Sequence, residues 1–262
     1  MNKEEETTQL LREIRGVLAC HQVNSIDTYP ANAELLSFFD SCRRQSVAPP
    51  SLKVPATSKP DAVVPEITLV EKQCDYSAIA DIATEVARCT GCQLARQRIT
   101  AVAGNGGGKN IRLLVIGHWL ASAEKGTGQA VFGLEEDYML ARMLSAIHLS
   151  MEEVFVTNVV KCGVGLNTIP QPEHIDACSS YLRRQIVALA PQLICTMGMV
   201  ATKNLLRLSQ PLSSLRGKFY TYKGVDGVEI PLLPTYHPGY LLQNPEMKNA
   251  TWQDLQAIQK RL

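Results

Sequence analysis

The sequence predicts an α/β fold with a mostly parallel sheet that is covered by helices on both faces. Short aliphatic runs alternate with amphipathic stretches over residues 77–262, a pattern typical of strand–helix–strand units. The run Val154–Asn158 is continuously β-branched and apolar before its polar end, as expected for a strand buried on both faces. Asn158 and Lys161 follow where this strand should end. The carboxyl edge of such a sheet is the usual place for a ligand.

The individual elements follow from the spacing of apolar residues. Helical spacing predicts helices over 77–88, 136–147, 172–189, 200–208 and 247–262. Apolar runs bounded by turn residues predict strands over 111–117, 155–158, 192–197, 219–222 and 229–233. Residues 117–133 and 235–242 are predicted to be loops.

The first 75 residues differ from the rest in composition and charge. Helical spacing predicts a helical appendage within residues 1–44, and proline-rich residues 45–75 predict a flexible linker. Residues 76–262 would form the main domain. Residues 1–85 hold 8 Lys+Arg against 13 Asp+Glu, and the remainder holds 18 against 12. The basic remainder fits a polyanionic partner such as DNA, and the acidic segment is a candidate contact for a protein partner.

Composition also narrows the cellular setting. No apolar run is long enough to span a membrane, and Met1–Glu6 lacks the basic and apolar regions of a secretory signal. We therefore expect a cytoplasmic, monomeric protein without membrane contact. Its cysteines should stay reduced unless they bind a metal.

Four of the eight cysteines have the spacing of a metal site. Cys89 and Cys92 form a C-x-x-C pair, and Cys162 and Cys178 lie sixteen residues apart across a predicted loop and helix. Thiolates bind either zinc or an iron–sulfur cluster. The wide second pair favours the larger cluster, while four unrelated thiols remain the alternative.

Several motifs occur in a fixed order from residue 89 to residue 242. They are Cys89-x-x-Cys92-x-Leu-x-x-x-Arg, Thr157-Asn-Val-Val-Lys-Cys162, the proline-flanked helix to Cys178, Leu215-Arg-Gly217 and Pro234-Thr-Tyr-His-Pro-Gly-Tyr-Leu-Leu242. In these motifs the chain from about Ala87 to its end resembles the family 4 uracil-DNA glycosylases. The resemblance implies a three-layer α/β/α fold with a central four-stranded, mostly parallel sheet. It also implies a [4Fe–4S] cluster on the four cysteines, with structural zinc as the alternative, and single- or double-stranded DNA as partner.

The resemblance also assigns roles to single residues. Asn158 matches the asparagine that reads the edge of a flipped-out uracil, since an amide both donates and accepts hydrogen bonds. His237 matches the histidine that donates to uracil O2 as the base departs. Gly117 and Asn167 match substrate-binding positions in the first loop and in the loop before Cys178.

Three further residues are predicted to contact DNA. Leu241 and Leu242 match the apolar wedge that enters the duplex beside the vacated base, with core packing as the rival interpretation. Arg216, in the Leu-Arg-Gly motif, is the third.

The first loop departs from the family pattern. There the family reads Gly-Glu-Ala/Gly-Pro-Gly and later Gly-Arg-Pro-Phe-Val-Gly. In this chain His118 replaces the glutamate that positions the attacking water, and Val131 replaces the aromatic residue under the uracil ring, with Phe132 one position along. Glu124 is a candidate substitute for the carboxylate, and Trp119 would reshape the pocket.

Three functions therefore stay open. The first is a DNA glycosylase that hydrolyses the N-glycosidic bond of uracil in DNA repair, with activity weakened by the His118 change. The second is a catalytically silent homologue that binds DNA or a protein. The third is a glycosylase with altered base specificity.

Overall fold

The computed structural model describes residues 74–108, 110–122, 130–224 and 227–262. The predicted appendage, nearly all of the predicted linker and the candidate carboxylate Glu124 lie outside these residues. No helix of the described part is long and apolar enough to cross a membrane.

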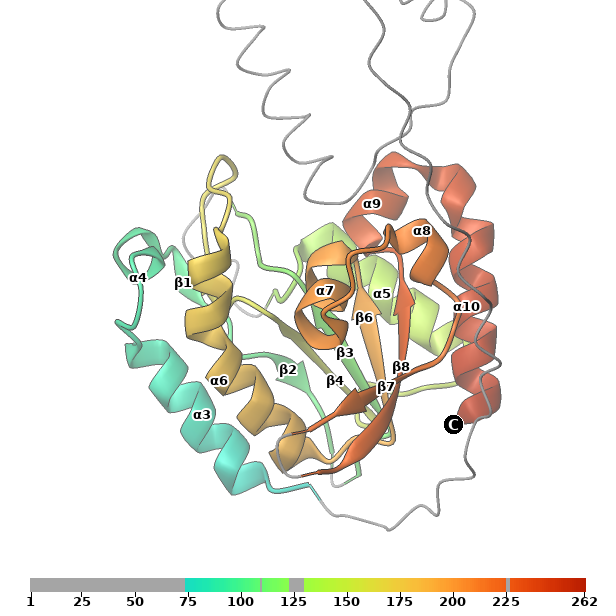
Figure 1. Ribbon diagram of the computed structural model, residues 1–262, viewed down its shortest axis with the longest axis horizontal. Helices are drawn as coiled ribbons and strands as arrows, with labels where there is room; N and C mark the ends of the chain where they lie inside the picture. The colour runs from blue at the N-terminus through green and yellow to red at the C-terminus, as the bar shows by residue number, and fades with distance from the viewer. Residues whose placement is uncertain (1–73, 109, 123–129, 225–226) are drawn as a thin grey trace, which may run out of the picture. The chain divides into compact units, whose positions relative to one another are not determined.

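In the described residues, six strands form the central sheet, in the order β2-β4-β3-β6-β8-β7. The four inner strands are mutually parallel: β4 (Val154–Asn158), β3 (Leu113–Gly117), β6 (Leu193–Met197) and β8 (Glu229–Thr235). The edge strands β2 (Asn105–Gly106) and β7 (Tyr220–Lys223) are antiparallel to their neighbours. The predicted four-stranded parallel centre is therefore confirmed (Figure 1).

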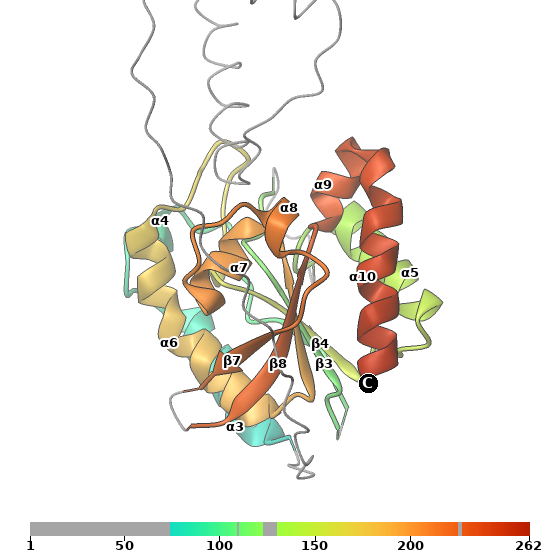
Figure 2. The same ribbon diagram turned by 45° about the vertical axis from the view of Figure 1, so that its right-hand side comes forward.

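Helices cover both faces of the sheet, which gives the predicted three layers (Figures 1 and 2). One face packs against α5 (Leu134–Ala146) and α10 (Lys248–Arg261). The other face packs against α3 (Tyr76–Arg88), α6 (Pro172–Leu189) and α7 (Met199–Leu206).

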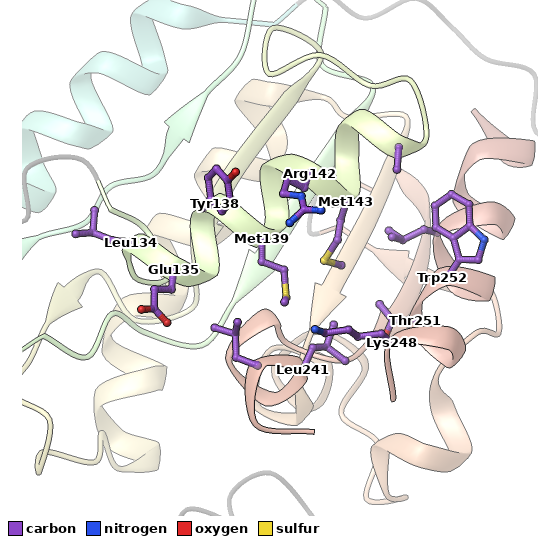
Figure 3. Close-up of a pocket in the computed structure, with 13 residues that line it drawn as sticks. Leu134, Glu135, Tyr138, Met139, Arg142, Met143, Leu241, Lys248, Thr251 and Trp252 are labelled. Carbon is purple, nitrogen blue, oxygen red and sulfur yellow. The ribbon is translucent and has the colours of Figure 1, made fainter. Parts of the chain in front are cut away.

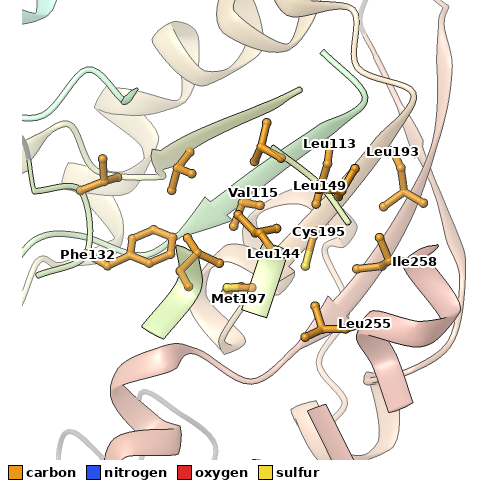
Figure 4. Packing of buried hydrophobic residues seen from close by; sticks show 14 of the residues in the cluster. Leu113, Val115, Phe132, Leu144, Leu149, Leu193, Cys195, Met197, Leu255 and Ile258 are labelled. Atoms are coloured by element: carbon orange, nitrogen blue, oxygen red, sulfur yellow. The ribbon is translucent and has the colours of Figure 1, made fainter. Parts of the chain in front are cut away.

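Alternation along β3 explains how one strand serves both layers. Leu113 and Val115 face the α5 and α10 side, whereas Leu114 and Ile116 face the α3 and α6 side. All of β3 is buried, as a parallel strand between two helical layers requires. Figure 4 shows Leu113 and Val115 packed with Leu144 of α5, and Leu255 and Ile258 of α10 close by.

Short elements complete the domain. They are α4 (Leu94–Gln97), α8 (Leu212–Leu215), α9 (Pro238–Gln243), the 3-10 turn Pro245–Met247, and the paired strands β1 (Thr100–Ala101) and β5 (Cys162–Gly163). The prediction of a loop over 235–242 is wrong in its second half, where α9 forms. His237 caps this helix by accepting a hydrogen bond from the Gly239 amide, and Pro238 fits the first helical position.

Candidate active site

Three parallel strands bring the predicted site residues to one edge of the sheet. Gly117 ends β3 directly opposite Asn158 at the end of β4, and His237 follows β8 by two residues. The His118 ring lies 4.3 Å from the His237 ring, centroid to centroid. The carboxyl edge predicted from the sequence is therefore where these side chains meet.

Asn158 is fully buried and has a free acceptor atom. Its Nδ2 donates to the Val131 carbonyl over 2.5 Å, which fixes the orientation of the amide. Its Oδ1 has no hydrogen-bond partner among the described residues. Buried polar atoms are nearly always paired, because leaving one unpaired costs about 1–3 kcal/mol. The unpaired oxygen therefore indicates a ligand that carries a donor.

His237 offers the complementary atom. Its Nδ1 accepts from the Gly239 amide over 3.1 Å, so the ring proton of the neutral imidazole resides on Nε2. Nε2 is buried and has no partner in the described part of the chain. Burial, reinforced by the neighbouring His118, holds the pKa of His237 well below its usual value. His237 is thus a neutral donor.

An aromatic ring lies against these two residues. The Phe132 ring is 4.7 Å from the His237 ring, centroid to centroid. A β-carbon on Gly117 would meet the Phe132 ring at 2.3 Å and Asn158 Oδ1 at 2.7 Å. Position 117 therefore has to be glycine for Phe132 and Asn158 to lie where they do.

The loop before α5 holds Phe132 in this position. Asp137 accepts hydrogen bonds from the amides of Val131 over 2.7 Å and of Phe132 over 3.1 Å. The side chains of Val131 and Phe132 both belong to the buried cluster on this face of the sheet. Of the two, Phe132 has its ring against His237, while Val131 reaches Asn158 through its carbonyl.

His118 stands where the sequence comparison expected a carboxylate. Its ring lies between those of Trp119, at 4.4 Å, and His237. Some of its surface is still accessible, but the surrounding protein displaces enough water to lower its pKa to about 4. Trp119 is buried in an apolar cluster with Cys162 and Cys178, with its ring against that of His118. Its expected effect on the shape of the pocket stays a prediction.

The other predicted residues separate into exposed and engaged positions. Asn167 is exposed in the loop before α6, and among the described residues no hydrogen bond joins it to Asn158 or His237. Arg216 forms an ion pair of 2.6 Å with the buried Asp254. Asp254 also accepts from the Thr235 hydroxyl. The guanidinium is thus engaged inside the domain, and its DNA contact stays a prediction.

The two candidate wedge leucines behave differently. Leu241 is buried, as the rival core-packing interpretation expected, while Leu242 is 37% exposed. Both line a groove of about 710 Å³ between α5, α9 and α10. Figure 3 shows Tyr138, Met139 and Arg142 of α5 on one wall and Trp252 of α10 on another. Of the two leucines, only Leu242 is free to contact a partner.

Three of the four predicted metal ligands lie in or against one apolar cluster. Cys162 of β5 and Cys178 of α6 pack in one apolar cluster, and Cys92 is packed against it. Burial, together with the nearby Cys92 and Cys89, raises the pKa of Cys178. Within the described residues, no three His, Cys, Asp or Glu side chains lie close enough together to ligate one ion. An all-thiol set of four in a largely apolar setting still has the donor chemistry of a cluster or zinc site.

Comparison with known proteins identifies the class. The family model described as the uracil DNA glycosylase superfamily matches residues 104–256, which span β2 to α10.

Among individual relatives, the type-4 uracil-DNA glycosylase of Saccharolobus solfataricus is 34% identical over 185 residues, covering 69% of this chain and 85% of that protein. The protein of the same description from Sulfurisphaera tokodaii is 33% identical over 187 residues, covering 70% and 84%. That of Thermotoga maritima is 29% identical over 178 residues, covering 67% and 90%. This chain belongs to the type-4 uracil-DNA glycosylase family.

Sequence reasoning missed two acidic residues beside the site. Asp137 holds the backbone of Val131 and Phe132, and Glu136 lies beside Gly133 and Gly239. The available signal was the run of acidic residues at the start of α5. Acidic residues are common in a first helical turn, so the run alone does not point to a site.

Proposed function

We propose that this protein hydrolyses the N-glycosidic bond of uracil in DNA. The observation that carries the proposal is the pair of unsatisfied atoms in a buried site, the Asn158 Oδ1 acceptor and the His237 Nε2 donor. Uracil presents a donor at N3–H and an acceptor at O2 on adjacent ring atoms, which matches this pair. The names of the relatives support the same activity.

Asn158 would select the base. Its Oδ1 would accept from N3–H, and the second hydrogen of Nδ2, which the Val131 carbonyl leaves free, would donate to O4. Cytosine has no N3–H and carries an amino group at C4, so both contacts would fail. Phe132 would stack on the flipped base, which is worth about 1–3 kcal/mol.

His237 would stabilise the leaving group. As the bond to the sugar breaks, negative charge develops on the base, and the Nε2–H would donate to O2. A preorganised donor of this kind contributes on the order of 10²–10³ in rate. Because its pKa is so low, the imidazole acts as a neutral hydrogen-bond donor rather than as a proton source.

Position 118 offers no carboxylate to orient the attacking water. His118 is neutral above a pH of about 4, so its free nitrogen can accept a hydrogen bond from water and orient it. It supplies no negative charge to the cationic sugar, so we expect slower excision than a carboxylate would give.

The exposed Leu242 would enter the duplex beside the vacated base.

We also propose that Cys89, Cys92, Cys162 and Cys178 hold a [4Fe–4S] cluster, with structural zinc as the alternative. Either would brace α3, β5 and α6 together by covalent bonds. Brown colour with broad visible absorption is expected, together with bound iron. A colourless protein that contains zinc would rule out the cluster.

A second candidate is a glycosylase scaffold that binds DNA without excision, and the neutral His118 favours it. The deciding experiment is excision of uracil from single-stranded and duplex oligonucleotides under enzyme excess, with His237→Ala as the matched variant. Excision that falls on the order of 10²-fold or more in His237→Ala would support the glycosylase. DNA binding without excision would favour the silent scaffold. The protein contact through residues 1–75, the monomeric state and the cytoplasmic location stay predictions.

A further inference from the structure

Glu136 is a partly buried carboxylate next to the candidate active site, and no step above uses it. It belongs to the first turn of α5. A β-carbon on Gly239 would lie 3.4 Å from Glu136 Oε1 and 3.3 Å from His237 Nδ1. The carboxylate and the imidazole therefore border the same glycine, at the contact between α5 and α9.

A second glycine receives the other oxygen of the carboxylate. A β-carbon on Gly133, the residue after Phe132, would collide with Glu136 Oε2. Glu136 thus lies between Gly133, which follows Phe132, and Gly239, whose amide donates to His237. A side chain at position 133 would exclude this placement, whereas a β-carbon at position 239 would only touch the carboxylate.

The charge of Glu136 has no partner inside the described domain. No hydrogen bond or ion pair of its carboxylate occurs among the described residues, whereas the nearby Asp137 takes two backbone amides. The unpaired Asn158 Oδ1 and His237 Nε2 mark the adjoining space as the one built for a ligand. A negative charge without a partner therefore lies close to His237, next to the glycine whose amide donates to the imidazole.

We propose that Glu136 supplies negative charge that the histidine at position 118 no longer provides. The inference rests on the proposed function. Breaking the glycosidic bond builds positive charge on the sugar, and a preorganised charge in a site with little water stabilises it without reorganisation. Glu136 acts across Gly239 and His237 by its field. It neither touches the water nor takes its proton.

A purely structural role for Glu136 has to be separated from this one. Any carboxylate in the first turn of a helix interacts favourably with the helix dipole. Glu135 is in the same first turn of α5 but lines the outer groove with Leu241 and Leu242 (Figure 3), and it is not among the atoms nearest to Gly239. Glu135→Gln is therefore a matched control for Glu136→Gln.

The test uses the full-length protein and two measurements. Single-turnover excision of uracil from single-stranded DNA reports the chemical step, and anisotropy of a uracil-free oligonucleotide reports DNA binding. We expect Glu136→Gln to lower the excision rate about tenfold or more, and Glu135→Gln to change it by less than about twofold. Glu136→Asp should recover part of the loss.

The DNA affinity separates the two roles. Glu136→Gln removes negative charge near a polyanion, so binding should stay equal or tighten. Loss of a structural contact would instead weaken binding and lower the melting temperature along with the rate. Joint loss of rate, affinity and stability in Glu136→Gln would therefore overturn the proposal.

A His118→Glu background tests the compensation itself. With the carboxylate restored, Glu136→Gln should cost less than it does beside His118, and an equal loss in both backgrounds would contradict the proposal. Equal rates for Glu136→Gln and Glu135→Gln would overturn it and leave the glycosylase function intact. A wild-type protein that binds DNA but excises no uracil would overturn both.

Discussion

Replacing His118 by glutamate tests whether position 118 limits the chemistry. The His118 ring lies 4.3 Å from His237, in the centre of the candidate site. A glutamate there would add a negative charge to the site. At an assumed separation of about 5 Å from the cationic sugar and an effective dielectric of about 20, such a charge is worth about 3 kcal/mol, or on the order of 10² in rate.

Part of this gain would be lost to desolvation. The surroundings that lower the pKa of His118 to about 4 disfavour charge of either sign, so they would raise the pKa of an introduced glutamate. Its ionised fraction, and with it the excision rate, should therefore increase with pH. We expect a net gain of about 10- to 100-fold above the pKa of the new carboxyl group.

The assay is single-turnover excision of uracil from single-stranded DNA, measured from pH 5 to pH 8. His118→Gln is the control, because it has the length of glutamate without the charge. A His118→Glu protein no faster than His118→Gln at any pH would refute the reasoning. The remaining changes in the loop before α5 would then limit the rate.

Two further predictions concern the pocket and its imidazoles. Gly117→Ala should abolish most excision, since the new β-carbon would lie 2.3 Å from the Phe132 ring. Its DNA affinity should be retained, and an unchanged excision rate would show that Phe132 can move without cost. The second prediction is a loss of stability on acidification. The lowered pKa of His118 means that the unfolded chain binds more protons between pH 6.5 and about 4. The stabilisation from neutral His118 is thus complete above pH 6.5 and lost as the pH falls toward 4. Urea unfolding at pH 7 and pH 5 should show a loss larger than that of His118→Gln by about 2 kcal/mol. An equal loss in both proteins would contradict the shift.

The framework of the fold was predictable because it rests on local patterns. The parallel strands are apolar almost throughout, since both of their faces are buried, and α6 begins at the proline that the sequence marks. Helix α9 was missed because its six residues depend on the His237 cap. The β1–β5 pairing was missed because it joins Ala101 to Cys162, far along the chain.

Strand ends revealed only part of the site. The end of the strand over 154–158 pointed to Asn158, whereas the resemblance to the family identified His118 and His237, and the structure brings the three together. Which of two adjacent residues points into the site depends on contacts distant in sequence. Asn158 donates a hydrogen bond to the Val131 carbonyl, and the ring of the next residue, Phe132, lies against His237. In the same way, no local pattern in the sequence indicates that Arg216 pairs with Asp254, 38 positions later.

The charge of His118 determines how much stabilisation of the cationic sugar is lost when histidine replaces the glutamate of the family. A protonated histidine would turn a stabilising charge into a repelling one, a change of two units beside the cationic sugar. Because its pKa is about 4, His118 is neutral at physiological pH and the change is one unit. At about 3 kcal/mol per charge, replacing one unit requires half the compensation that two units would require. The displacement of water around His118 would therefore limit the stabilisation that another group, such as Glu136, has to supply.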